Sequence, residues 1–99
     1  MAKQQRDHKW LNAKDFGKIN PLHAVITDIW IEKKARGDET VIEFLAEGQL
    51  RVCMSIWGNN KNVLIDKFGD EDSLWIGKHI TIFQEKQNDG SCFRTITPQ

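Results

Sequence analysis

The chain of 99 residues has no tyrosine, only two prolines and only two cysteines. The cysteines, Cys53 and Cys92, form no CxxC pair and have no histidine at ligand spacing, which argues against a structural zinc site. No stretch approaches the roughly 20 apolar residues of a membrane span. No secretion signal is visible either. We therefore expect a cytoplasmic protein with reduced thiols and no membrane partner.

An excess of charge of either sign is also missing. Lysine plus arginine and aspartate plus glutamate number 14 each, so the formal net charge is zero. This balance does not indicate a nucleic-acid binder, and any such function requires a local basic patch. The acidic run at residues 70–72 lacks the glycine and downstream glutamate of a calcium loop, and we expect it to be solvated.

Signs of catalysis are missing too. His8, His23 and His79 lie on separate predicted elements and form no catalytic set. The sequence contains no nucleophile elbow and no phosphate-cradling glycine loop. We therefore predict no enzyme, no small-molecule substrate, no metal and no cofactor.

Strand character is clearest in Leu22–Lys34, where Leu22, Ala24 and Ile26 alternate with His23, Val25 and Thr27. The next apolar pair, Ile29 and Ile31, is out of step by one residue. A slip of this kind predicts a β-bulge at residue 27 or 28, which bends the strand. Trp30 is then expected to face away from the core, opposite Ile29 and Ile31.

Four more strands are predicted at residues 40–46, 49–54, 78–84 and 92–97, and a helix of about nine residues between the third and the fourth. Asn59 or Asn60 is expected to cap this helix, and Gly69 to end it. In the last strand, Phe93 and Ile96 are three residues apart and cannot both face inward without a bulge. Inward positions are predicted at Ile42, Phe44, Leu50, Val52, Met54, Ile80 and Ile82, and outward positions at Val41, Glu43, Leu45, Arg51, Cys53, His79, Thr81 and Phe83.

The order of these elements is strand, strand, strand, helix, strand, strand. It predicts an all-β fold with one short helix, arranged as the five-stranded barrel of the OB fold. A bent first strand suits such a barrel, because it can pair with both the second and the fourth strand. We place a single domain at residues 13–99, preceded by a basic and flexible tail at residues 1–12.

A local motif supports the same fold. The chain reads Asp-Glu-Asp-Ser-Leu-Trp-Ile-Gly-Lys-His-Ile-Thr-Ile over residues 70–82. This stretch resembles a motif of small phage-encoded OB-fold proteins, in which a helix ends in glycine and an acidic loop leads through Trp-Ile-Gly-Lys into a strand. The resemblance spans roughly residues 11–98. It implies an OB fold and single-stranded DNA binding, in a protein of the host cytoplasm that assists phage replication or recombination.

One departure concerns the end of the chain. Single-stranded DNA-binding proteins often end in an acidic, Pro/Gly-rich tail that recruits partners, whereas this sequence closes on Thr-Pro-Gln. We therefore expect no tail-mediated recruitment of replication proteins.

Single-strand binding requires cations for phosphates and flat side chains for bases. The alternative for each candidate is structural: the tail or a second subunit covers Trp30, the cations form a solvated hairpin tip, and Phe83 packs under a loop. The N-terminal tail is either a solvated end or a basic arm that extends the site, whereas Trp57 and Trp75 are expected to plug the barrel. The candidate nucleic-acid-binding residues are Trp30, Lys33, Lys34, Arg36, Arg51, Phe83 and Arg94, with Trp10, Arg6 and Lys9 from the tail.

Two further hypotheses concern partners. The apolar residues Val25, Val41 and Leu45, with Trp30, could instead form an interface for a partner protein or a homo-oligomer. RNA is an alternative ligand to single-stranded DNA, because stacking does not distinguish the two sugars.

Overall fold

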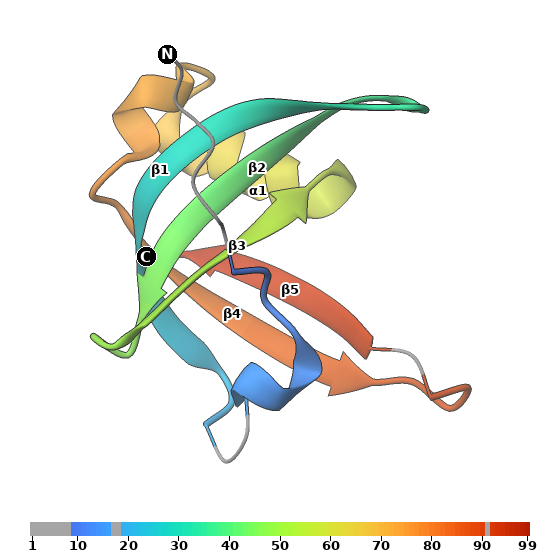
Figure 1. Cartoon of the computed structure of the whole chain (residues 1–99). Coiled ribbons are helices and arrows are strands. Elements are labelled where there is room, and N and C mark those ends of the chain that lie inside the picture. Colours follow the sequence, from blue (N-terminus) through green and yellow to red (C-terminus); the bar gives the residue numbers. More distant parts are fainter. Residues whose placement is uncertain (1–8, 17–18, 91) are drawn as a thin grey trace.

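The computed structural model describes residues 9–16, 19–90 and 92–99 (Figure 1). These residues form one five-stranded sheet, one α-helix and two short 3₁₀ helices. The elements in chain order are η1 (Ala13–Phe16), β1 (Leu22–Lys34), β2 (Gly37–Ala46), β3 (Leu50–Ile56), α1 (Gly58–Phe68), η2 (Asp72–Trp75), β4 (His79–Lys86) and β5 (Cys92–Pro98). The prediction of a mostly β chain with one short helix between the third and fourth strands is confirmed.

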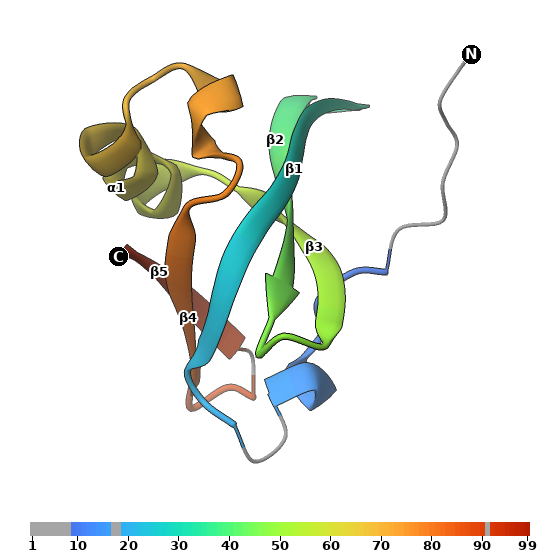
Figure 2. The ribbon, with the colours of Figure 1, turned by 90° about the vertical axis from the view of Figure 1, so that its left-hand side faces the viewer.

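The sheet has the strand order β3-β2-β1-β4-β5, and each pair of neighbours is antiparallel. In the described residues β3 and β5 do not pair, so the sheet is open along these two edges. Figure 2 shows the sheet strongly curved, with α1 and η2 near one end and η1 near the other.

The first strand holds the two halves of the sheet together. It pairs with β2 from Ala24 to Lys34 and with β4 from Leu22 to Val25. The register against β2 shifts between Ile26 and Asp28, which leaves the residue between them without a partner. The predicted bulge is therefore confirmed. It lies just beyond the segment that pairs on both sides, where the strand bends from one half of the sheet into the other.

The core fills the concave side of this curved sheet. The predicted inward residues of β2 and β4 are fully buried, and Trp75 joins them as the predicted plug. The indole Nε1 of Trp75 donates to the carbonyl of Gly69 at 2.8 Å, so this side chain also satisfies the end of α1. Leu11 and Phe16 belong to the same core, although the sequence analysis assigns Leu11 to the tail.

Two predictions for β2 are wrong. Val41 is expected on the outer face but is completely buried, in a cross-strand row between Trp30 and Ser55. Glu43 is expected in water but is only 7% exposed. Its carboxylate Oε1 accepts from Thr27 Oγ1 at 3.1 Å and lies 3.5 Å from Arg51 Nη1. Thr27, the bulge residue, and Arg51 therefore provide the polar contacts that water would make with an exposed carboxylate.

Three other predicted inward positions behave differently. Ile31 is 51% exposed, because the β1–β2 hairpin extends past the core. Trp57 is 69% exposed and does not plug the fold. Leu50 is only partly buried, although it packs against the core. Periodicity predicts the face of a strand, but not where the core ends along that face.

The helix begins earlier than predicted. Trp57 is its N-cap residue and makes no side-chain capping bond, so the expected asparagine cap is wrong. The predicted stop at Gly69 is correct: this residue has φ = 95°, which glycine adopts without steric cost, and its N–H donates to Ile65 O at 2.8 Å. Within the described residues no helix has the length and apolar character that crossing a membrane requires.

Asn60 ties the helix to the edge of the sheet. Its side-chain Nδ2 donates to Arg94 O at 2.9 Å, and its Oδ1 accepts from Ile96 N at 3.0 Å. One side chain therefore satisfies a backbone carbonyl and a backbone N–H on the free edge of β5. This also blocks that edge against pairing with another chain.

Replacing Asn60 with alanine should destabilise the fold by about 1–3 kcal/mol, because it leaves two partly buried backbone groups unsatisfied. Urea denaturation followed by tryptophan fluorescence measures this loss. The exposed neighbour Asn59 is the matched control, and its alanine variant should change stability by less than about 0.5 kcal/mol. Equal effects of the two substitutions would contradict the role of Asn60 as the tie.

Candidate functional site

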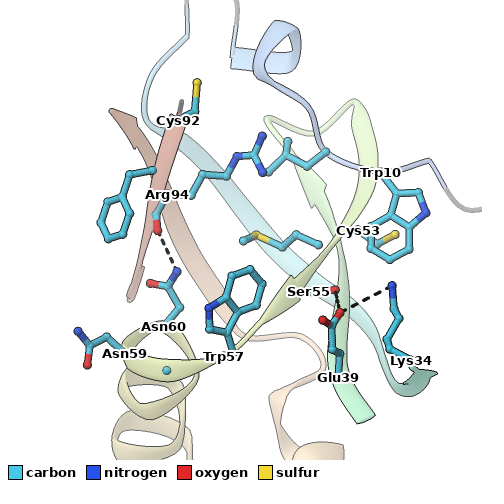
Figure 3. Close-up of a pocket in the computed structure, with 14 residues that line it drawn as sticks. Trp10, Lys34, Glu39, Cys53, Ser55, Trp57, Asn59, Asn60, Cys92 and Arg94 are labelled. Atoms are coloured by element: carbon cyan, nitrogen blue, oxygen red, sulfur yellow. Dashed lines mark hydrogen bonds and ion pairs between the residues drawn. The ribbon is translucent and has the colours of Figure 1, made fainter. Parts of the chain in front are cut away.

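A groove of about 590 Å³ lies where β3 and β5 face each other without pairing (Figure 3). Its walls come from five parts of the chain: the N-terminal segment, the β1–β2 hairpin, β3, the start of α1 and the start of β5. These parts are far apart in sequence, and the curvature of the sheet brings them together. The lining residues are Trp10, Leu11, Lys34, Glu39, Cys53, Met54, Ser55, Trp57, Gly58, Asn59, Asn60, Cys92, Phe93 and Arg94.

Three large aromatic side chains line this groove and remain accessible to solvent. Trp10 is 42%, Trp57 69% and Phe93 56% exposed. Such exposure costs hydrophobic free energy, since burying an aromatic side chain is worth about 1.5–3 kcal/mol. Flat exposed faces around one concavity are suited to stacking on planar ligands.

The charged groups of the groove are mixed. The Lys34 ammonium lies 5.7 Å from the centroid of the Trp10 ring and 3.7 Å from Glu39 Oε1. On the opposite wall, Arg94 Nε donates to Gln84 Oε1 at 3.2 Å, and its guanidinium lies 5.9 Å from the ring of Phe16. Glu39 also accepts from Ser55 Oγ at 2.8 Å. The two cations and one carboxylate of the lining give 2 − 1 = +1, a weakly positive groove in a neutral protein.

A short N-terminal segment, Lys9 to Leu11, occupies part of the free edge of β3. Cys53 N–H donates to Lys9 O, and Leu11 N–H donates to Cys53 O, both at 2.9 Å. Trp10 forms a parallel bridge with Cys53. This pairing fixes Trp10 on the wall of the groove and blocks part of an edge that would otherwise be open.

Ser55 lies farther along the same edge. The alternation of an antiparallel ladder directs the N–H and C=O of Ser55 to the same side as those of Cys53. In the described part of the chain the backbone of Ser55 has no partner on that side. The groove therefore presents backbone hydrogen-bonding groups as well as aromatic faces.

The segment also explains the burial of Cys53. The sequence predicts that this thiol points outward, and this prediction is wrong. The N-terminal segment covers the thiol, and the exposed fraction of Cys53 is zero. Burial, and to a smaller extent the nearby carboxylates of Glu43 and Glu32, raises the pKa of Cys53 to about 11. Cys92, in contrast, is exposed at the rim of the groove.

Of the predicted set, Trp10, Lys34 and Arg94 line the groove, and the other members that the structure describes do not. Lys33 is exposed on the opposite face of β1 from Lys34, and Arg36 is exposed in the hairpin turn. Lys9 lies 3.8 Å from Asp15. Arg51 pairs with Glu43 as described above, Phe83 is 45% exposed on β4, and Arg6 lies outside the described residues.

Trp30 does not line the groove. It is half-buried on the outer face of β1, and its indole Nε1 lies 3.4 Å from Glu32 Oε1. The register places the carboxylates of Asp28 and Glu43 on the same face next to Trp30, which disfavours phosphate beside this indole. The alternative hypothesis is an apolar interface formed by Val25, Val41, Leu45 and Trp30. Val41 cannot contribute to it, because this side chain is buried within the monomer.

Trp57 and Phe93 are the groove residues that sequence reasoning misses. For Phe93 a signal existed: once Ile96 faces inward, a residue three positions earlier faces the other way, and the structure has this arrangement. For Trp57, which lies between β3 and α1, neither the strand period nor the helix period applies.

The remaining surface offers little chemistry. Among the described residues, no three histidine, cysteine, aspartate or glutamate side chains gather as a metal-binding group. A smaller hollow of about 260 Å³, lined by residues of β1, β2, the β2–β3 turn, β4 and the C-terminus, includes His23 and His79. His23 Nδ1 lies 3.3 Å from Thr81 Oγ1, so this ring already has a polar neighbour.

The thiols give a direct test of the N-terminal segment. In a Cys92→Ser variant, Cys53 should resist a thiol reagent at pH 8 and react only after denaturation, because it is covered and its pKa is raised. In a Cys53→Ser variant, Cys92 should react at once. Raising the pH should leave native Cys53 slow until about pH 11, its folded-state pKa. Fast labelling of native Cys53 at pH 8 would show that the segment does not cover it.

No protein-family model and no curated protein matches the chain. The function is therefore inferred from the groove between β3 and β5 and from the residues that line it.

Proposed function

We propose that the protein binds single-stranded DNA in the groove between β3 and β5. The observation that carries the proposal is the gathering of three exposed aromatic side chains, Trp10, Trp57 and Phe93, around one concave surface. Stacking on such platforms contributes about 1–3 kcal/mol per base and tolerates any sequence. A single strand offers base faces for this, whereas a duplex hides them between its own base pairs.

The proposed fold is an open barrel of the OB type. Three features support it: the bulged first strand shared by β2 and β4, the helix between β3 and β4, and the closeness of β3 and β5 along the groove. In OB folds the surface of the central strands and the loops beside it receive single strands. Here the β1–β2 hairpin contributes Lys34 and Glu39 to one side of the groove.

The charges indicate which force dominates binding. Lys34 and Arg94 offer two phosphate contacts, and each contact changes the logarithm of the binding constant by about −0.7 per tenfold increase in salt. Two contacts give a slope of about −1.4. Stacking by three aromatics is the larger contribution, which is compatible with zero net charge. The ligand could equally be single-stranded RNA, and competition between matched strands separates the two.

Trp57→Ala should weaken binding of a mixed-sequence, single-stranded oligonucleotide by about tenfold, because it removes one stacking platform. Fluorescence anisotropy of a labelled strand measures the change. Trp57 is highly exposed, so the variant should stay folded. Trp30→Ala is the control and should bind as the native protein does. Absence of binding at low salt, or a larger loss with Trp30→Ala, would overturn the proposed site.

The binding constant from the same titration should depend only weakly on salt. A plot of its logarithm against the logarithm of the salt concentration should have a slope between about −1 and −2. Lys34→Ala should reduce its magnitude by about 0.7, because one counterion fewer is released. Lys33→Ala changes the same charge on the opposite face of β1 and should leave the slope unaltered. A slope of about −5 would mean that phosphates bind mainly outside this groove.

A further inference from the structure

Glu39 is an unexpected residue in a groove for a polyanion. Both of its described contacts use the same oxygen: Oε1 accepts from Ser55 Oγ at 2.8 Å and lies 3.7 Å from Lys34 Nζ. The other carboxylate oxygen, Oε2, has no hydrogen bond or ion pair within the described residues. The groove therefore contains a carboxylate acceptor with a free oxygen.

The neighbours of this carboxylate hold it in place. Ser55 fixes it from β3, and Lys34 fixes it from the end of β1 while lying over the ring of Trp10. In the view of Figure 3, Glu39 and Ser55 lie between the Trp10 and Trp57 side chains. Because Lys34 Nζ lies both over the Trp10 ring and next to Glu39 Oε1, a base that stacks beside Trp10 can present its edge to the carboxylate.

A carboxylate accepts hydrogen bonds and donates none. It repels phosphate oxygens and the 4-oxo group of thymine or uracil, but it accepts from the exocyclic amine of cytosine, adenine or guanine. Glutamate and aspartate accept from the cytosine amine in known protein–DNA contacts. A carboxylate that meets the 4-position of a pyrimidine therefore favours cytosine over uracil, although the two bases have the same size and similar stacking.

We propose that Glu39 reads the edge of one bound base and favours an exocyclic amine over a 4-oxo group. The inference rests on the proposed single-strand function and adds a base preference at one position of an otherwise sequence-tolerant groove. Ser55 acts as a positioning residue, because it holds the carboxylate without touching the base.

Cytosine and uracil give the sharpest comparison, because they have the same size. They differ in the group at the 4-position and in whether the adjacent ring nitrogen carries a proton. The native protein should bind an oligo-dC of about eight nucleotides roughly tenfold more tightly than the matched oligo-dU, as one charge-assisted hydrogen bond allows. Titration at pH 8 keeps cytosine neutral.

Glu39→Gln should reduce the dC/dU ratio to about one, because an amide accepts from the amine through its oxygen and donates to the 4-oxo group through its nitrogen. The variant should also bind oligo-dU more tightly than the native protein does, since the repulsion is lost. Glu71→Gln removes the same charge from an exposed position outside the groove and should preserve the native ratio.

The possible failures are distinguishable. If neither strand binds the native protein, the proposed function itself is wrong. If both strands bind but the ratio is near one, or if Glu39→Gln keeps a tenfold ratio, the groove binds single strands and Glu39 does not read the base. Circular dichroism of each variant verifies that the protein is folded in the titrations with both oligonucleotides.

Discussion

The shared pairing of β1 is the constraint on which the rest of the structure depends. The strand must bond to β2 along most of its length and to β4 at its beginning, and the bulge after Ile26 lets it bend between the two. Without that bend the sheet would be flatter, and the edges of β3 and β5 would lie apart. The same bulge supplies Thr27 to the buried carboxylate of Glu43, so the bend and the packing of the outer face are coupled.

The open line between β3 and β5 follows from this curvature. Exposed strand edges are sites of unwanted pairing, and the chain covers parts of both edges with its own groups. The segment from Lys9 to Leu11 bonds to β3 at Cys53, and Asn60 bonds to β5 at two backbone atoms. The uncovered remainder is the groove. Its aromatic lining carries the proposed single-strand function, and its carboxylate, Glu39, carries the proposed base preference.

The fold was more predictable than the site, and for a physical reason. The alternation in β1, its slip by one residue and the glycine stop at Gly69 are local patterns, so they can be recognised without knowing what packs against them. The burial of Val41 and Glu43 depends on partners from other strands. The chemistry of the side chains alone is enough to choose Trp10, Lys34 and Arg94 as candidate nucleic-acid-binding residues. Their grouping with Trp57 and Phe93 requires β3 to face β5, which no local pattern specifies.

The four tryptophans provide one direct measurement of the central claim, because each indole N–H gives its own signal in a ¹H–¹⁵N NMR spectrum. Titration with a mixed-sequence single strand should shift the signals of Trp10 and Trp57, which lie in the groove. The signals of Trp30, which does not line the groove, and of Trp75, in the core, should stay nearly unchanged. Shifts centred on Trp30, or no shifts at low salt, would contradict binding in the groove between β3 and β5.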